Sequence, residues 1–267
     1  MKKNSQTKKS FDVVLLSFLD YKKEGRCYRA YKALSEVSSV YVIDSGDQAV
    51  SEENRTFIPK MKSNIKNVIN FTRRAISAAG MVSFKTLYVS NFYTAIAALF
   101  IRKQTKCRVI YDAYELFYPE GNEHFSKRDQ FFYFFEKIII RKADAVIAAN
   151  DSRALIMLGY YRLRQMPYVV ENISGTPGML NGVHKKGATC KLVYAGYLSK
   201  KRGLAELVEA VQKLGDFHDL SLDIYGAGEN IDWFLSLAEI DPHFHYHGTY
   251  DNNQLPEILS QYDVGFI

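Results

Sequence analysis

The chain has 267 residues, of which 47% are hydrophobic and 24% are charged, and this balance excludes wholesale disorder. The length allows one large domain or two modest ones, with a core that needs no covalent staples. Its three cysteines, Cys27, Cys107 and Cys190, lie far apart without a CxxC motif. They predict neither disulfides nor a zinc site and favour a reduced, intracellular protein. No signal peptide is recognisable, and no apolar run approaches the ~18 residues of a spanning helix.

The net charge of +6 is distributed unevenly along the chain. Residues 1–172 contain 28 Lys and Arg against 17 Asp and Glu, a balance of +11, whereas residues 173–267 contain 7 against 12, a balance of −5. Such asymmetry predicts two units with different partners. A basic first unit suits a nucleic acid, an anionic membrane surface or a phosphorylated ligand. Nucleic acid is the weakest of these options, because no RNA- or DNA-binding motif is recognisable.

In the first half, short apolar runs alternate with segments of helical periodicity. The runs predicted as strands are 11–17, 40–43, 86–90, 108–112, 143–148 and 168–170. The segments predicted as helices are 24–37, 62–79, 92–102, 127–141 and 152–158. This alternation indicates βαβ units and therefore a parallel sheet with helices on both faces. Residues 1–172 are accordingly predicted to form a Rossmann-like domain.

Residues 173–190 interrupt the alternation with turn-forming residues and predict a linker. The alternation then resumes. The predicted strands are 191–195, 220–225, 244–247 and 263–267, and the predicted helices are 204–214, 230–238 and 254–261. The predicted fold class is therefore α/β, with two Rossmann-like parallel-sheet domains. Because the chain stops inside the last predicted strand, residues 191–267 are expected to be an incomplete second domain of a truncated protein.

Two glycine-bearing loops follow successive predicted strands of the second half. Gly196 precedes a basic segment, which consists of Lys200, Lys201 and Arg202, at the start of a predicted helix. A glycine lets the backbone approach a ligand, and a helix N-terminus supplies free N–H groups to a phosphate. A solvated basic turn is the alternative for this segment on its own.

The second loop contains Gly226, Gly228 and Glu229, again just before a predicted helix. The third glycine of a dinucleotide fingerprint is absent, which disfavours NAD binding. Glycine loops at two successive strand ends nevertheless predict a ligand site, because open α/β sheets bind ligands at the carboxyl ends of their strands.

The first half contributes polar residues at predicted strand ends. Asp112, Tyr114 and Glu115 follow the strand 108–112, where a carboxylate can orient a hydroxyl or act as a general base. A helix-capping or surface acid is an equally good interpretation. Asp20, Arg26 and Arg29 lie after the first strand. They predict contact with an anionic acceptor or donor phosphate, or else a solvated face.

Taken in order, these segments resemble GT-B-fold glycosyltransferases of the large family 4 type, which transfer sugars from nucleotide donors. Residues 111–117 resemble the family's aspartate–x–histidine–glutamate–leucine segment, and residues 195–204 resemble its loop for the donor diphosphate. Further segments match the family's elements in order: 136–148, 169–172, 224–229, 244–248 and 255–264. The resemblance covers nearly the whole chain.

The resemblance implies a retaining, metal-independent glycosyltransferase that uses a nucleotide-sugar co-substrate and no other cofactor. It assigns Asp112, Tyr114 and Glu115 to the catalytic region. It assigns donor binding to Gly196, Lys200, Lys201, Arg202, Gly226, Gly228 and Glu229, and the acceptor side to Asp20, Arg26 and Arg29. The acceptor would be a saccharide or a lipid-linked saccharide, in bacterial surface polysaccharide synthesis. The chain would be cytoplasmic, with peripheral contact at the inner face of the membrane as an option.

Several positions depart from the family pattern. The family's diphosphate-binding arginine falls on Tyr197, its lysine on Arg202 and its histidine on Tyr114. Its glutamate–x7–glutamate segment would follow Ile267. A truncated, inactive remnant, or one half of a split enzyme completed by a second chain, is therefore the alternative to a complete transferase.

Three other patterns are open to two interpretations each. Lys62, Lys66 and Arg73 share one predicted helix face, which suits a membrane surface or, more commonly, solvent. The aromatic-rich helical segment 131–139 suits lipid, but core packing is favoured. The histidines at 243, 245 and 247 alternate along a strand, and metal binding is disfavoured because zinc needs further ligands.

Overall fold

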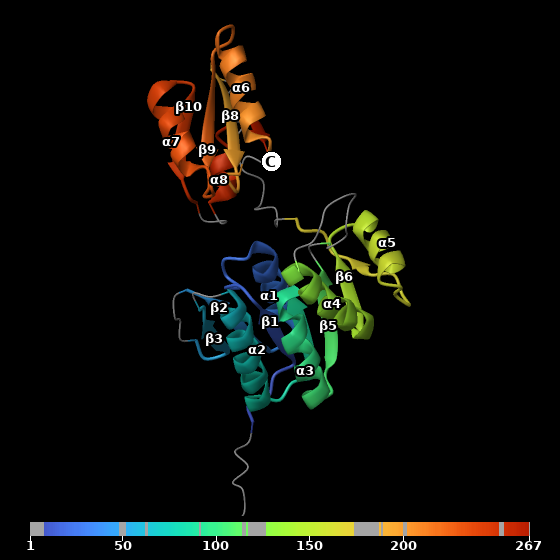
Figure 1. The fold of residues 1–267 in the computed structure, drawn as a ribbon. Coiled ribbons are helices and arrows are strands. Elements are labelled where there is room, and N and C mark those ends of the chain that lie inside the picture. Colours follow the sequence, from blue (N-terminus) through green and yellow to red (C-terminus); the bar gives the residue numbers. More distant parts are fainter. Residues whose placement is uncertain are drawn as a thin grey trace, which may run out of the picture. The chain divides into compact units, whose positions relative to one another are not determined.

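The computed structural model describes residues 8–47, 52–61, 64–90, 92–113, 116, 127–173, 187, 189–199, 202–250 and 254–266. The chain divides into two compact units, Met1–Ile173 and Ser174–Ile267. Figure 1 shows helices and strands alternating along the chain within each unit. Most of the linker predicted over 173–190 lies outside the described residues.

The first unit is built on a seven-stranded sheet in the order β3-β2-β1-β4-β5-β6-β7. The strands are β1 (Val13–Ser17), β2 (Val40–Gly46), β3 (Arg55–Pro59), β4 (Thr86–Ser90), β5 (Arg108–Ala113), β6 (Ala145–Ala148) and β7 (Tyr168–Val169). Every neighbouring pair is parallel. The carboxyl ends of the strands therefore meet at one edge of the sheet and the amino ends at the other.

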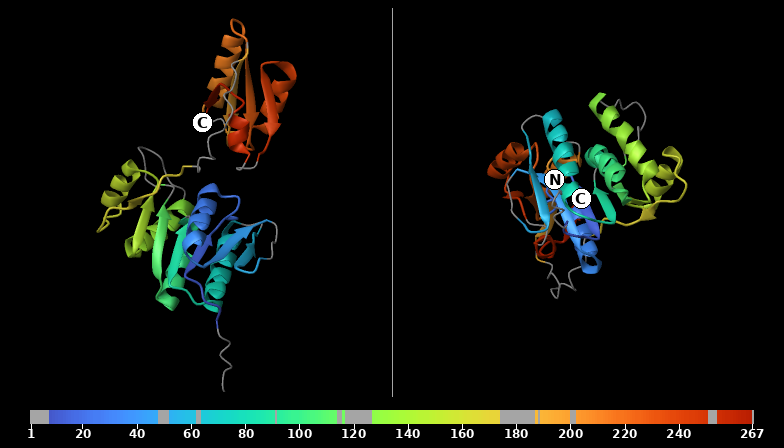
Figure 2. Two further views of the ribbon diagram at one scale, coloured as in Figure 1. Left: turned by 180° about the vertical axis from the view of Figure 1, so that it is seen from behind. Right: turned by 90° about the horizontal axis from the view of Figure 1, so that it is seen from below.

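Helices cover both faces of this sheet, as Figures 1 and 2 show. They are α1 (Gly25–Val37), α2 (Asn64–Met81), α3 (Ala95–Thr105) after a short 3-10 turn η1 (Phe92–Thr94), α4 (Lys127–Lys142) and α5 (Asp151–Tyr160). All five residues of β1 are buried. Val13 and Leu15 belong to the cluster under α1, and Val14 and Leu16 to the larger cluster under the other helices. Burial on both faces explains why the strand is continuously apolar.

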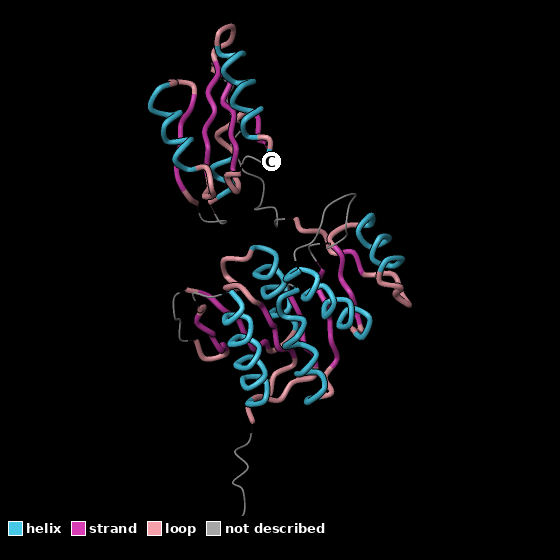
Figure 3. The backbone as a smooth tube through the Cα atoms, in the orientation of Figure 1, coloured by secondary structure: helices cyan, strands magenta, loops and turns pink. Residues whose placement is uncertain are grey.

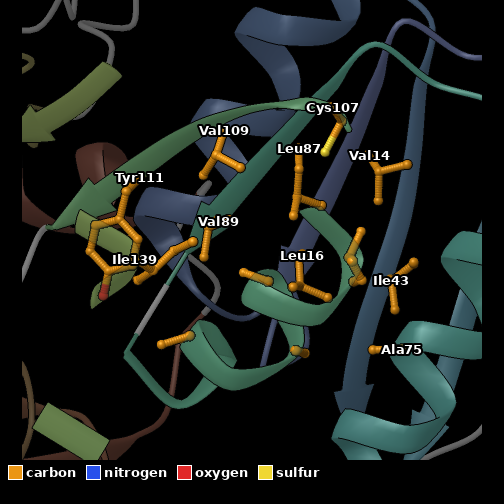
Figure 4. Close-up of a cluster of buried hydrophobic side chains, with 14 of the residues drawn as sticks. Val14, Leu16, Ile43, Ala75, Leu87, Val89, Cys107, Val109, Tyr111 and Ile139 are labelled. Atoms are coloured by element: carbon orange, nitrogen blue, oxygen red, sulfur yellow. The ribbon is translucent and has the colours of Figure 1, made fainter. Parts of the chain in front are cut away.

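The larger core cluster is drawn in Figure 4. Side chains of β1, β2, β4 and β5 interdigitate there with residues such as Ala75 of α2 and Ile139 of α4. Of the aromatic-rich segment, Phe132 and Ile139 are buried, but Phe131 and Phe134 are more than half exposed. Core packing therefore explains only part of that segment.

β3 is the one strand of the first unit that the sequence pattern does not predict. Its residues Arg55 and Thr56 are polar, and Pro59 ends it. The Arg55 side chain is nevertheless buried, because Asp44 of β2 and Asp20 neutralise it. Phe57 and Ile58 are the only apolar residues of the strand before Pro59, which is too short a run for sequence periodicity to recognise.

The second unit has a four-stranded parallel sheet in the order β10-β9-β8-β11. Its elements are β8 (Cys190–Ala195), α6 (Leu204–Gly215), β9 (Leu220–Tyr225), α7 (Ile231–Ile240), β10 (Phe244–Gly248), α8 (Leu255–Leu259) and β11 (Val264–Phe266). One sheet face packs against α6 and α7 through Leu222, Ile224, Val208 and Phe234. Figure 3 shows strands and helices alternating here too. The prediction of two Rossmann-like parallel-sheet units is confirmed.

Within the described parts of the chain, no helix is both long and apolar enough to cross a membrane.

Candidate functional site

In the second unit, the loops that follow β8 and β9 pack backbone against backbone. The Gly196 N–H donates to the Tyr225 carbonyl at 3.0 Å, and the Leu198 N–H donates to the Ala227 carbonyl at 3.0 Å. Leu198 and Gly228 form an isolated parallel bridge. The two glycine-bearing loops predicted from the sequence therefore lie side by side and hydrogen-bond each other at the carboxyl edge of the sheet.

Both glycines of the second loop are sterically required. Gly226 has φ +140°, a conformation that favours glycine, and a Cβ there would lie 1.8 Å from the Gly196 carbonyl oxygen. A Cβ on Gly228 would lie 2.2 Å from the Leu198 carbonyl oxygen. Any side chain at either position would push the loops apart. The glycines thus serve close backbone contact between the two loops.

Three further hydrogen bonds, which the sequence did not reveal, hold the two loops in position. The Tyr194 hydroxyl donates to the Tyr197 carbonyl, and the Tyr246 hydroxyl donates to the Gly226 carbonyl, both at 2.9 Å. The Gly226 N–H donates to the Gly248 carbonyl at 2.7 Å. A signal was present for Tyr246, which lies between the exposed His245 and His247 on a strand of period two, but not for Tyr194, whose neighbour Val193 is also buried.

The α6 helix begins directly after the first loop. Its N-cap is Gly203, with φ +69°, and no side chain caps the helix. The exposed Arg202 comes just before it, and its N–H donates to the Ser199 carbonyl at 3.0 Å. An uncapped helix N-terminus with a neighbouring guanidinium suits an anion. Lys200 and Lys201 lie outside the described residues, and Glu229 is exposed.

In the first unit, the structure brings Arg26 and Asp112 together in a buried ion pair. Arg26 Nε lies 3.0 and 2.9 Å from the two Asp112 oxygens, and Nη2 lies 2.7 Å from Oδ1. The Tyr88 hydroxyl donates to Asp112 Oδ2 at 2.6 Å, and Arg26 Nη1 donates to the Val170 carbonyl at 2.9 Å. The carboxylate of Asp112 is thus saturated by its neighbours, which suits an anchor for α1 better than a general base.

Sequence reasoning missed Tyr88. It lies on β4, one strand from Asp112 on β5, and Ser90 pairs in register with Asp112. Tyr88 and Ser90 share a sheet face because they are two residues apart. Burial and the neighbouring Asp112 carboxylate raise the pKa of Tyr88 well above its usual range, so it remains a hydrogen-bond donor.

The α1 helix starts at the same edge, where Glu24 caps it. The Glu24 carboxylate accepts from the N–H groups of Arg26 and Cys27. Burial raises the pKa of Glu24, and the two N–H groups oppose that rise. Burial also raises the pKa of the Cys27 thiol to about 12. Arg29, one turn further along α1, hydrogen-bonds Asn172 after β7.

Asp20 belongs to a separate cluster around Arg55. Arg55 Nη2 lies 3.0 Å from Asp20 Oδ1 and 2.7 Å from Asp44 Oδ2. Burial raises the pKa of Asp44, although its hydrogen bonds with Arg55 oppose the rise. The predicted acceptor-side residues are therefore not together: Asp20 lies in the Arg55 cluster, whereas Arg26 and Arg29 lie on α1 beside Asp112 and Asn172. Tyr114 and Glu115 lie outside the described residues, so their assignments stay predictions.

No group of His, Cys, Asp or Glu side chains that could hold a metal ion occurs among the residues that the structure describes. His245 and His247 both face Asp223, whereas the His243 ring contacts Asp241 at 2.9 Å. The alternating histidines do not act as a set, since only two of them share a partner.

Comparison with solved structures identifies the fold. Sucrose-phosphate synthase from Thermosynechococcus elongatus matches with a TM-score of 0.67 at 13% sequence identity, over 95% of this chain and 74% of its own. HepE of Anabaena, solved in complex with UDP, matches with a TM-score of 0.68 at 13% identity, over 95% and 73%. The chain has the GT-B fold.

A third GT-B structure, the lipopolysaccharide outer core galactosyltransferase WaaB in its apo form, has a TM-score of 0.60 at 9% identity, over 95% of this chain and 73% of its own. No protein-family profile matches the sequence, and no curated protein matches it either. The fold is thus shared with glycosyltransferase structures that are 9–13% identical to this chain in sequence.

Proposed function

We propose that this GT-B chain transfers a sugar from a nucleotide-sugar donor, which binds at the glycine loops of the second unit. The observation that carries the proposal is the steric demand at Gly226 and Gly228, where a Cβ would lie 1.8 and 2.2 Å from the facing backbone. These glycines hold two loops together at the carboxyl edge of a parallel sheet, where ligands of open α/β sheets bind.

The start of α6 supplies the electrostatics for the donor diphosphate. Free N–H groups of the first helical turn and the Arg202 guanidinium would stabilise the charge that develops on the leaving nucleotide diphosphate. Lys200 and Lys201 stay predicted donor contacts. HepE has been solved with UDP and with UDP-glucose, which makes uridine nucleotides the first donors to test.

The acceptor side is proposed at the carboxyl edge of the first sheet. Asp112 holds Arg26, and Tyr88 in turn holds Asp112. Because Arg26 and Arg29 both lie on α1, Arg29 is presented from a fixed position, where it hydrogen-bonds Asn172. Glu115 follows the same strand as Asp112 and is proposed as the group nearest the reacting hydroxyl. A retaining, metal-independent reaction, a saccharide or lipid-linked acceptor and a role in surface polysaccharide synthesis complete the proposal, and they derive from the family resemblance.

The test is binding and turnover with a panel of nucleotide sugars, with and without EDTA. We expect saturable donor binding, slow donor hydrolysis that survives EDTA, and weaker donor binding with slower hydrolysis in Arg202→Ala. Lys213→Ala, at the other end of α6, is the matched control because Lys213 contacts only Glu209 in the described structure. Absence of donor binding in the wild-type chain would contradict the proposal.

The two alternatives from the sequence are distinguished by the same assay. Donor binding without turnover would favour an inactive remnant. Donor binding with turnover only after addition of a second chain would favour a split enzyme.

A further inference from the structure

The amino edge of the first sheet, opposite the site residues, carries a concentrated group of cations. They come from the end of α3, the start of β5, the end of α4 and the segment after α5. We call them the basic edge: Arg102, Lys103, Lys106, Arg108, Arg141, Lys142, Arg162 and Arg164. All are exposed except the half-buried Arg102.

Two adjoining hollows lie along the basic edge, with volumes of about 560 and 600 Å³. They share Lys142 and Asp144, and Asp144 is the one acid among their lining residues. The second hollow has apolar walls, which are formed by Leu99, Phe100, Phe135 and Ile138. α3 and α4 lie side by side here (Figures 1 and 2). The surface therefore combines a cationic rim with apolar walls.

Large aromatic side chains extend the apolar part into solvent. Phe100 is 51% exposed, Phe131 54% and Phe134 60%. Phe131 contacts the Phe135 ring at a centroid distance of 5.0 Å. Positions 131, 135, 138 and 142 follow helical spacing, so an apolar stripe of α4 runs down to Lys142. Phe100 lines the second hollow, while Phe131 and Phe134 lie on α4 just before the residues of that helix that line it. An exposed aromatic side chain beside a basic rim is typical of an interaction surface.

Structural needs of the first unit account for only part of this charge. Cations at the ends of α3 and α4 complement the helix dipoles, which explains Arg102, Lys103, Arg141 and Lys142, and also Lys106, the C-cap residue of α3. The same reason does not apply to Arg108, Arg162 and Arg164. Arg102 pairs with Asp144 at 3.3 Å. Across the described parts of the chain, no ion pair engages the other cations of the basic edge.

We propose that the basic edge and its exposed phenylalanines dock the chain on an anionic phospholipid bilayer. The cations would lie at the headgroup phosphates, and Phe100 and Phe134 would enter the interfacial region. This pairing favours a lipid surface over nucleic acid, because the cations surround aliphatic and aromatic side chains next to a hollow. The inference stands apart from the donor site, since no residue of that site contributes to it.

The proposal differs from the membrane face that the sequence suggested. Lys66 and Arg73 are exposed on α2, but neither of the two hollows involves them. Lys62 lies outside the described residues. Docking through the basic edge and docking through α2 therefore predict opposite effects on membrane binding for variants of the two surfaces.

The experiment is co-sedimentation of the full chain with phosphatidylcholine vesicles and with vesicles that also contain phosphatidylglycerol. One variant neutralises the basic edge, Lys103→Gln/Arg108→Gln/Lys142→Gln. Its control removes the same charge from α2, Lys66→Gln/Arg73→Gln/Arg74→Gln. We expect the wild type to prefer anionic vesicles, and the edge variant to bind them on the order of 100-fold more weakly. The α2 variant should bind within about threefold of the wild type.

A second variant, Phe100→Ser/Phe134→Ser, separates the insertion of the phenylalanines into the bilayer from the attraction of the cations to the headgroups. It should weaken vesicle binding roughly tenfold and make the remainder more salt-sensitive. Circular dichroism and nucleotide binding report that each variant is folded. The proposal is overturned if the wild type fails to bind anionic vesicles or if the α2 variant loses binding instead. Equal or tighter binding of duplex RNA or DNA through the same three cations would also overturn it.

Discussion

The two units differ in the contacts that lie at the carboxyl edges of their sheets. In the first unit, side-chain charges are buried there and paired, as Arg26 is with Asp112. In the second unit, the edge is made of two glycine loops that pack backbone against backbone. The first arrangement fixes a helix in position, while the second fixes two loops against each other through their backbones. Similar topology therefore relies on paired side chains in one unit and on close backbone contacts in the other, where we propose the donor site.

Breaking the buried pair of the first unit should have the largest effect. Arg26→Met leaves the Asp112 carboxylate buried beside only the Tyr88 hydroxyl, and we expect a loss of about 3–5 kcal/mol of unfolding free energy. Denaturant unfolding followed by circular dichroism measures it. Arg26→Met/Asp112→Asn should recover part of the loss, since no unpaired charge remains. Equal losses in the single and double variants would show that the pair matters only through packing.

Gly226→Ala tests the opposite edge. The new Cβ must displace the Gly196 carbonyl from 1.8 Å, so we expect at least about 2 kcal/mol of destabilisation and more than tenfold weaker nucleotide binding. Calorimetry with UDP gives the second value. Gly265→Ala is the control in the same unit, because its Cβ would meet only Val193 Cγ1, at 3.9 Å. If Gly226→Ala binds nucleotide normally, the loops do not form the donor site.

Arg202→Ala should weaken nucleotide binding without affecting folding. Loss of one charge-assisted contact to a phosphate corresponds to about 1.5–3 kcal/mol, which is on the order of 10- to 100-fold in Kd. The exposed side chain makes little contribution to unfolding free energy, so the midpoint of urea unfolding should not move. Arg202→Lys should recover part of the affinity. A shifted urea midpoint with unchanged nucleotide affinity would mean that Arg202 stabilises the fold and does not bind the donor.

Cysteine reactivity gives the smallest effect and compares the two units directly. Cys27 is buried and its pKa is raised to about 12, so it stays a thiol as the pH rises from 7 to 9. Cys190, at the start of β8, is partly exposed. Mass spectrometry after iodoacetamide treatment should find Cys190 modified and Cys27 unmodified in the folded chain. Rapid modification of Cys27 would mean that the edge around α1 opens readily.

Most of the fold could be predicted from the sequence because burial on both faces makes parallel strands continuously apolar. The strands 86–90 and 220–225 were predicted with the bounds that the structure gives. β3 was missed since one of its two buried residues is Arg55, whose burial is offset by Asp20 and Asp44, and the other, Ile58, is too short a signal on its own. Sequence periodicity reports apolar burial and does not report paired charges.

The candidate site was predictable in part for the same reason. Glycines and cations after strands marked the loops of the second unit, and local spacing was enough to find them. The direct partnership of Arg26 with Asp112 spans 86 positions, and Tyr88 joins it as a further donor to Asp112, so no local pattern encodes it. The sequence suggested Asp112 for the catalytic region and Arg26 for the acceptor side, and the structure shows the two neutralising each other.

Amide NMR of the labelled chain during titration with UDP and UDP-glucose tests the central claim most directly. The account predicts saturable shifts at residues 196–199, 202–205 and 226–229, with no saturable shifts along the basic edge. Shifts confined to the first unit, or none in the glycine loops at saturating nucleotide, would contradict it.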